Sequence, residues 1–140
     1  TYHAPGQLVG YLVVDLAARG RRDAHRFLRE IEAALCDALA TLGLAAETRV
    51  GITGVFVAQD DTDARPRKLA SIGVGLKGWV SWHGFALNVD LDLAGFDSIV
   101  ACGLRDVEMA SIASELGARR PPDLGERTRV AVADSFAKHF

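Results

Sequence analysis

The chain has 140 residues, of which 49% are hydrophobic and 24% are charged, a balance typical of one globular domain with its own core. Its net charge of -2 at pH 7 lacks the basic excess expected of a nucleic-acid-binding protein, so we exclude nucleic acid as a partner. No stretch approaches the roughly 18 apolar residues of a membrane span, and no export signal is visible, so we expect no membrane association and a cytoplasmic location.

The chain has two cysteines, and their surroundings differ. Cys36 lies inside the periodic apolar pattern EIEAALCDALATL, as a core residue does, whereas Cys102 follows a short apolar run in GFDSIVACGLRD. Two separated thiols without a CxxC pattern make neither a disulfide framework nor a zinc site. We therefore expect no metal, and we treat Cys102 as a candidate reactive thiol.

The first half of the chain predicts one strand followed by one long helix. Residues 8–16 (LVGYLVVDL) are mostly apolar and suit a buried strand. Residues 24–44 carry apolar side chains at intervals of three and four, which predicts an amphipathic helix with Asp23 as its N-cap and Gly43 at its end.

The middle of the chain predicts a succession of strands. Residues 45–50 suggest a short edge strand, 54–59 and 68–76 suggest two more, and 80–93 suggest one or two further strands. Short connections between successive strands favour antiparallel or mixed pairing over repeated βαβ units.

Two helices are expected near the C-terminus, one over residues 107–116 ending at Gly117 and one that Asp123 caps. No repeat or linker divides the sequence. We therefore expect a single α+β domain over residues 1–140, with a mixed, largely antiparallel sheet flanked by helices.

A reactive role for Cys102 requires a partner. A free thiol has a pKa of about 8.5, so it needs a cation, a base or a helix N-terminus nearby to become a nucleophile at neutral pH. The candidates are His3, Lys68, Lys77 and His83. Lys68 also has a plain structural interpretation as a strand-end lysine pointing into water, and His83 as a histidine satisfied within the core. His3 lies on a Pro-Gly loop, where a core position is less expected and ligand contacts are more common. Residue types alone leave both possibilities open.

Five segments in this order and spacing resemble one family: TYHAPGQLVGY, GVFVAQ, KLASIGVGL, HGFALNVDLDLAGF and IVACGLRD. They are similar to the octanoyltransferases of lipoate biosynthesis, which belong to a larger group with the lipoate and biotin protein ligases. The resemblance covers nearly all of residues 1–117 and implies the catalytic-domain fold of that group.

The resemblance implies an acyl transfer without ATP or another cofactor. Cys102 matches the family's Pro-Cys-Gly cysteine, which takes an octanoyl group from acyl carrier protein as a thioester. Lys68 matches the family's lysine, which would stabilise the thiolate and later act as a base. The implied acceptors are lysines of the lipoyl domains of 2-oxoacid dehydrogenases and of the glycine cleavage H protein.

The same resemblance implies a set of residues around the acyl group, in three segments where small side chains leave a slot between backbones. These residues are Tyr2 and His3 in the first segment, Ser71, Ile72 and Gly73 in the second, and His83, Gly84, Phe85 and Ala86 in the third.

The sequence departs from the family at three points. Ala4 and Ala101 stand where the family has Gly and Pro, so the first loop must not need a positive φ at residue 4. The family's usual N-terminal segment is not seen, and we expect the pocket to be open on one side. A catalytically incomplete module that binds an acyl group or a carrier protein is therefore an alternative, and a ligase relative that uses ATP is a second one, which Cys102 argues against.

The stretch ARGRRDAHRFLRE carries five arginines and offers a docking surface for an acidic carrier protein. The plain interpretation is a solvated start of the long helix.

Overall fold

The computed structural model describes residues 2–60, 65–98 and 106–140, and within these residues the strands form one sheet in the order β1-β5-β4-β3-β2, with β6 paired to β4. The strands are β1 (Gln7–Tyr11), β2 (Ala46–Arg49), β3 (Ile52–Val57), β4 (Arg67–Lys77), β5 (Val80–Asn88) and β6 (Glu108–Met109). The helices are α1 (Ala24–Thr41), α2 (Ile112–Leu116) and α3 (Leu124–His139), with the 3-10 turns η1 (Leu93–Ser98) and η3 (Gly117–Arg119). All pairs along the main path are antiparallel and only β4 with β6 is parallel, so the predicted α+β fold with a largely antiparallel sheet is confirmed.

The long helix α1 forms where the apolar periodicity predicts it. The carboxylate of Asp23 accepts a hydrogen bond from the backbone N–H of Arg26 at 3.0 Å, which satisfies one of the unpaired donors of the first turn. The helix ends before Gly43, whose φ of 78° suits glycine and turns the chain toward β2. The predicted start and stop of this helix are therefore confirmed.

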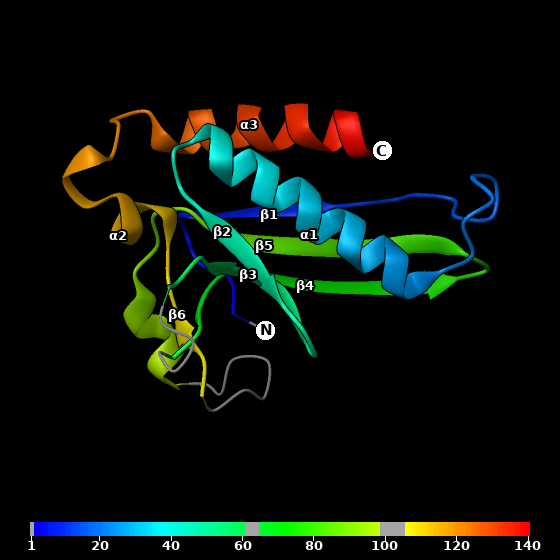
Figure 1. Cartoon of the computed structure of the whole chain (residues 1–140), viewed down its shortest axis with the longest axis horizontal. Coiled ribbons are helices and arrows are strands. Elements are labelled where there is room, and N and C mark those ends of the chain that lie inside the picture. The colour runs from blue at the N-terminus through cyan, green and yellow to red at the C-terminus, as the bar shows by residue number, and fades with distance from the viewer. Residues whose placement is uncertain (1, 61–64, 99–105) are drawn as a thin grey trace.

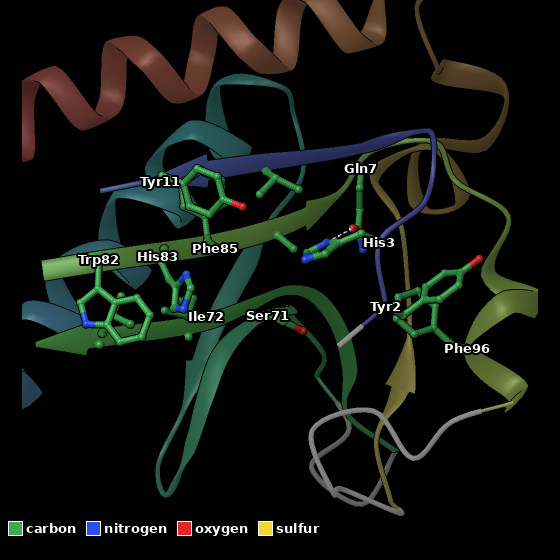
Figure 2. Close-up of a pocket in the computed structure, with 16 residues that line it drawn as sticks. Tyr2, His3, Gln7, Tyr11, Ser71, Ile72, Trp82, His83, Phe85 and Phe96 are labelled. Carbon is green, nitrogen blue, oxygen red and sulfur yellow. Dashed lines mark hydrogen bonds between the residues drawn. The ribbon is translucent and has the colours of Figure 1, made fainter. Parts of the chain in front are cut away.

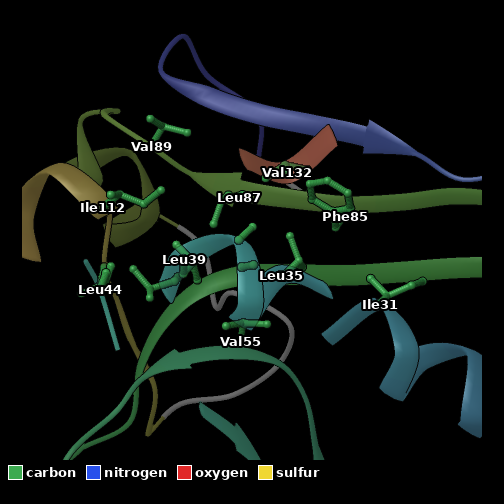
Figure 3. Close-up of a cluster of buried hydrophobic side chains, with 14 of the residues drawn as sticks. Ile31, Leu35, Leu39, Leu44, Val55, Phe85, Leu87, Val89, Ile112 and Val132 are labelled. Carbon is green, nitrogen blue, oxygen red and sulfur yellow. The ribbon is translucent and has the colours of Figure 1, made fainter. Parts of the chain in front are cut away.

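Helices α1 and α3 lie side by side against one face of the sheet (Figure 1). The apolar face of α1 packs there on β3, β4 and β5, and Figure 3 shows Leu35 and Leu39 of α1 among Val55, Leu87 and other buried side chains. From α3, Phe136 stacks on Phe85 of β5 with ring centroids 5.2 Å apart. The core therefore sits on the helix side of the sheet and leaves the opposite face available.

The first strand is shorter than its apolar sequence predicts. A strand over residues 8–16 is expected, but β1 ends at Tyr11 and only an isolated bridge follows, between Asp15 and Val80. The side chain of Ser81 replaces the regular ladder there: its hydroxyl accepts from the N–H of Val14 at 2.9 Å and donates to the carbonyl of Leu12 at 2.7 Å. A buried hydroxyl thus takes over ladder hydrogen bonds that an apolar pattern cannot reveal.

The prediction of one helix over residues 107–116 is wrong for the first half of that segment. It forms β6 and then α2, which begins only at Ile112. Ser111 and Ser114 build a capping box, each hydroxyl accepting the other's backbone N–H at 3.1 Å, and this fixes the helix start. Upstream of that cap, the chain pairs with β4 instead. The last helix begins after Asp123 as expected, although the Asp123 side chain makes no capping hydrogen bond.

Within the stretch 80–93 only Val80–Asn88 forms a strand, β5, which follows β4 through a tight hairpin, so the strand ends five residues before the predicted limit. Lys77 pairs with Val80, and the two residues between them, Gly78 and Trp79, have φ of 58° and 68°. Two positive φ values in a two-residue loop match the twist of the strands on either side. The long β4–β5 hairpin is therefore the framework on which the candidate site is built.

Candidate functional site

A hollow of about 700 Å³ lies over β1, β5 and β4 (Figure 2). The strand register sets small side chains next to one another across its floor: Val9 beside Ala86, Ala86 beside Ser71, and Gly84 beside Gly73. A Cβ atom built on Gly73 would meet no heavy atom within 4 Å, so the space above this residue is empty. The floor therefore offers an open slot directly over the two central strands.

One end of the hollow is closed by aromatic rings from the β4–β5 hairpin. The indole of Trp82 lies across Gly75, where an added Cβ would come within 2.2 Å of the ring. His83 packs against the same indole with ring centroids 4.1 Å apart, and both rings stand over the strands in Figure 2. His83 holds a φ of 65°, a conformation uncommon for a residue with a Cβ, and such strain is concentrated at functional sites.

The N-terminal loop forms the other end. Tyr2 packs edge to face against Phe96 of η1, with ring centroids 4.9 Å apart. Its hydroxyl lies over Gly95, where a Cβ would approach within 2.0 Å. Because η1 directly precedes residues 99–105, Tyr2 braces the point at which the chain enters the segment that contains Cys102.

A chain of side-chain hydrogen bonds ties this loop to the rest of the site. His3 Nδ1 lies 2.9 Å from Gln7 Oε1, and the Gln7 amide donates to Asn88 Oδ1 at 2.9 Å. Asn88, which is buried, donates in turn to the carbonyl of Ala110 at 2.9 Å. The four residues connect the first loop, β1, β5 and the segment between β6 and α2, so His3 has a fixed direction at the edge of the hollow.

Lys68 lies at the start of β4 and is only 2% exposed. Its ammonium donates a hydrogen bond to the carbonyl of Thr53 at 3.0 Å and lies 5.2 Å from the centre of the Phe56 ring. The interpretation of Lys68 as a strand-end lysine in water is therefore wrong. A buried lysine ammonium is uncommon and marks a candidate for chemistry.

Cys102 and Ala101 lie outside the described residues, so the expected pairing of Cys102 with Lys68 stays a prediction. The chain on the far side of that segment is described. Met109 of β6 pairs with Lys68, and Glu108 pairs with Arg67. After the segment that carries Cys102, the chain therefore rejoins the sheet with Met109 alongside Lys68.

All nine residues expected around an acyl group line this single hollow: Tyr2, His3, Ser71, Ile72, Gly73, His83, Gly84, Phe85 and Ala86. Phe85 and Ile72 also pack toward the core on the helix side. His83 is exposed in the hollow rather than satisfied within the core, so that alternative is wrong. The roles of these residues remain proposals, although the structure brings them together.

The sequence analysis missed several lining residues, namely Gln7, Val9, Tyr11, Trp82 and Phe96. For the first three a signal was present, because every second residue of a strand faces the same side of a sheet. Trp82 directly precedes the strained His83, and no pattern in the sequence predicts that the Trp82 indole covers Gly75.

The described lining contains aromatic, aliphatic, small and polar residues, and no Asp, Glu, Lys or Arg is among them. Walls without carboxylate, ammonium or guanidinium groups favour an apolar ligand, because burying a charge without a partner is costly. The volume falls within the range of small-molecule sites. The hollow can therefore hold an extended hydrocarbon chain.

Comparisons with known proteins agree with this arrangement. The sequence profile of the lipoyl protein ligase A/B catalytic domain matches residues 1–140. An octanoyltransferase of Geobacter metallireducens is 48% identical over 136 residues, which are 97% of this chain and 59% of that protein. One of Synechococcus elongatus is 45% identical over an alignment of 141 positions, which covers 100% of this chain and 55% of that protein.

This chain belongs to the lipoyl protein ligase A/B catalytic domain family. Among solved structures, a bipartite lipoate protein ligase of Thermoplasma acidophilum superposes with a TM-score of 0.67 at 18% identity, covering 99% of this chain and 52% of that one. This similarity confirms the expected ligase-like fold. The chain spans a little over half the length of the octanoyltransferases that it matches.

The N-terminal loop of this chain accommodates Ala4 at the position where the family has Gly. The N–H of Gln7 bonds to the carbonyl of Ala4 at 3.2 Å, and Ala4 is not among the described non-glycine residues with positive φ. The positive φ in this loop belongs to Gly6, at 92°, and the Gly6 carbonyl accepts hydrogen bonds from the N–H groups of Val89 and Asp90. The expectation that residue 4 needs no positive φ is therefore confirmed.

The arginine-rich stretch is largely occupied by partners within the fold. Arg21 and Arg26 both pair with Glu30 at 3.0 Å, and Arg19 donates to the carbonyl of Phe140. These pairs hold the start of α1 and the C-terminal residue. Docking of a carrier protein on this stretch stays a prediction. These internal pairs leave fewer guanidinium groups available for a partner.

Among residues 2–60, 65–98 and 106–140, no three His, Cys, Asp or Glu side chains lie together in a way that could hold a metal ion. Nor does this part of the chain contain a helix with the length and apolar character needed to cross a membrane.

Proposed function

We propose that this chain carries the catalytic centre of an octanoyltransferase, which moves an octanoyl group from acyl carrier protein to a lysine of a lipoyl domain. The observation that carries the proposal is the largely apolar hollow, whose lining on β4 begins at Ser71, three residues after the buried Lys68. Its relatives at 45–48% identity are named octanoyltransferases, which favours this donor and acceptor over others.

In the first half-reaction the thiolate of Cys102 attacks the carbonyl carbon of the octanoyl thioester. A new bond forms between that carbon and the cysteine sulfur, the bond to the carrier's sulfur breaks, and the carrier thiolate leaves and takes up a proton from the Lys68 ammonium. The ammonium of Lys68 favours the anionic forms of both sulfur atoms. Contact of the alkyl chain with the hollow contributes about 0.8 kcal/mol for each CH₂ buried.

In the second half-reaction the amine of the acceptor lysine attacks the Cys102 thioester. The amide bond forms, the bond to the cysteine sulfur breaks, and Lys68, having given up a proton, accepts one from the attacking amine. Replacing a thioester by an amide is favourable, so the sequence of steps needs no ATP.

Intact mass after incubation with octanoyl carrier protein tests the proposal. We expect the chain to gain the mass of one octanoyl group without ATP, and the Cys102→Ser variant to gain none. Cys36→Ser is the matched control, because it removes the other cysteine and should still be acylated.

A folded chain that gains no octanoyl mass would overturn the transferase proposal. If such a chain still bound octanoate, the alternative of an acyl-binding module would replace it. Acylation that requires ATP would instead favour a ligase activity.

A further inference from the structure

Two buried charged side chains approach one peptide group of β3 from opposite sides. The ammonium of Lys68 donates to the carbonyl oxygen of Thr53 at 3.0 Å, and the next N–H, that of Gly54, donates to Glu32 Oε1 at 2.9 Å. The carbonyl of Thr53 and the N–H of Gly54 belong to the same peptide bond. Glu32, on α1, is 0% exposed, and Lys68 is 2% exposed.

This peptide is available because the ladders on both sides of β3 are irregular. The register shifts between β2 and β3 and again between β3 and β4, and the described pairs on either side include neither Thr53 nor Gly54. A buried peptide left out of the ladders needs other hydrogen-bond partners. Here the two charged side chains provide them.

Gly54 makes the arrangement possible. Its φ of 136° is a conformation that residues with a Cβ rarely adopt. An added Cβ would also lie 2.8 Å from Cε and 3.1 Å from Nζ of Lys68. The end of the lysine side chain therefore occupies the space that the missing Cβ leaves.

Glu32 is itself held in place. Arg29, one turn earlier on α1, donates to its second carboxylate oxygen at 2.5 Å, and the Arg29 side chain is half exposed. Both oxygens of this buried carboxylate are thus hydrogen-bonded. A negative charge on the N–H side of a peptide polarises the peptide and makes its carbonyl a stronger acceptor.

We propose that Glu32 is a positioning residue for Lys68, acting through the Thr53–Gly54 peptide. The carboxylate strengthens the carbonyl that fixes the ammonium, while the peptide lies between the two charges. The ammonium is oriented in this way, so its charge can act on the reacting sulfur atoms. This inference rests on the proposed function only in assigning a reaction to Lys68.

The first test observes Lys68 without any reaction. The chain has three lysines, Lys68, Lys77 and Lys138, so the side-chain ¹⁵N signals of its ammonium groups can be assigned with a Lys68→Arg variant. In the native chain we expect slow exchange of the Lys68 ammonium protons with water. In Glu32→Gln, which keeps an acceptor oxygen but loses the charge, we expect a shifted signal and exchange faster by about tenfold.

The matched control is Glu30→Gln. Glu30 lies on the same helix and pairs with Arg21 and Arg26 rather than with β3, so its loss should leave the Lys68 signal unchanged. Arg29→Ala is a second variant at a half-exposed position, and it should change the signal less than Glu32→Gln does.

The second test measures acylation of Cys102. At saturating octanoyl carrier protein we expect the rate constant in Glu32→Gln to fall about 10- to 100-fold, with the concentration for half-maximal rate unchanged. Native exchange and a native rate in folded Glu32→Gln would overturn the inference. If the native chain is not acylated at all, the proposed function fails, and the ¹⁵N comparison still decides the role of Glu32.

Discussion

Single residues in the site are small for different physical reasons. Gly84 lies where an added Cβ would come within 2.1 Å of the Gly10 carbonyl oxygen, so it permits close approach of β1. Gly73 faces open space, so its lack of a side chain enlarges the hollow. The sequence shows only that both positions are glycine, and the neighbouring backbone decides which one permits close packing and which one enlarges the hollow.

The two cysteines should differ sharply in reactivity. Burial raises the pKa of the Cys36 thiol to about 11 from an ordinary value of 9.0, and the carboxylates of Glu32 and Asp37 add to the effect. Two pKa units correspond to about 100-fold less thiolate at neutral pH, and only the thiolate is nucleophilic. Cys36 is therefore a poor nucleophile in the folded chain.

We predict that Cys36 reacts with iodoacetamide about 100-fold more slowly than an ordinary thiol near pH 7, with a rate that keeps rising toward pH 11. The measurement uses Cys102→Ser, in which Cys36 is the sole cysteine. The same variant unfolded in urea is the control and should react at the ordinary rate. A rate in the folded chain that levels off below pH 9 would contradict the prediction.

At the scale of elements, helix α1 shows how local signals act together. Its apolar residues recur at three and four and are buried, its N-cap is a bonded aspartate, and its end is marked by a glycine with positive φ. Glu32 lies on the buried face, next to Ile31 and three residues before Leu35. A charged residue on an apolar helix face indicates a buried partner, so a signal for the role of Glu32 was present in the sequence.

The two N-cap aspartates should contribute differently to stability. The Asp23 side chain caps α1, so Asp23→Ala should lower the free energy of unfolding by about 1 kcal/mol. Asp123 makes no capping bond and pairs with the exposed Arg127 instead, so Asp123→Ala should cost less than about 0.5 kcal/mol. Urea denaturation of both variants measures the difference, and equal losses would show that cap geometry does not decide it.

At the scale of the whole molecule, the hollow exists only because distant segments meet. The N-terminal loop, β1, β4, β5 and η1 each supply part of its wall, and strand order brings β1 and β4 to opposite sides of β5. The helices cover the other face of the sheet, as Figure 1 shows. An acyl chain bound in the hollow would therefore contact residues that range along the sequence from Tyr2 to Phe96.

Tryptophan fluorescence offers a direct test of acyl binding. The chain has two tryptophans, both near the β4–β5 turn, and only Trp82 is among the described lining residues. Trp82 is 51% exposed, so an octanoate chain that covers it should shift its emission to shorter wavelength. We expect Trp79→Phe to keep this shift and Trp82→Phe to lose most of it.

Titration with octanoate measures the shift, and acetate, which has the same carboxylate without the chain, is the control ligand. A shift that persists in Trp82→Phe would place the acyl group elsewhere.

The elements could be predicted from the sequence wherever one local pattern decided the outcome. The periodicity of α1, the glycine after it and the alternation along β4 and β5 were sufficient there. Predictions failed where a side chain from another part of the chain intervened. The Ser81 hydroxyl bonds to backbone groups just beyond the end of β1, and the capping box of Ser111 and Ser114 sets the start of α2 at Ile112.

By itself the sequence determined the class of fold, because this depends on residue types at fixed spacings along strands and helices. Its resemblance to a known family indicated the group of residues that gather around one hollow. Only the tertiary structure decided that Lys68 is buried, that Trp82 and Tyr2 close the two ends, and that Glu32 reaches the same peptide as Lys68. Burial and hydrogen-bond partners arise between segments far apart in the chain, and no local pattern encodes which two segments will meet.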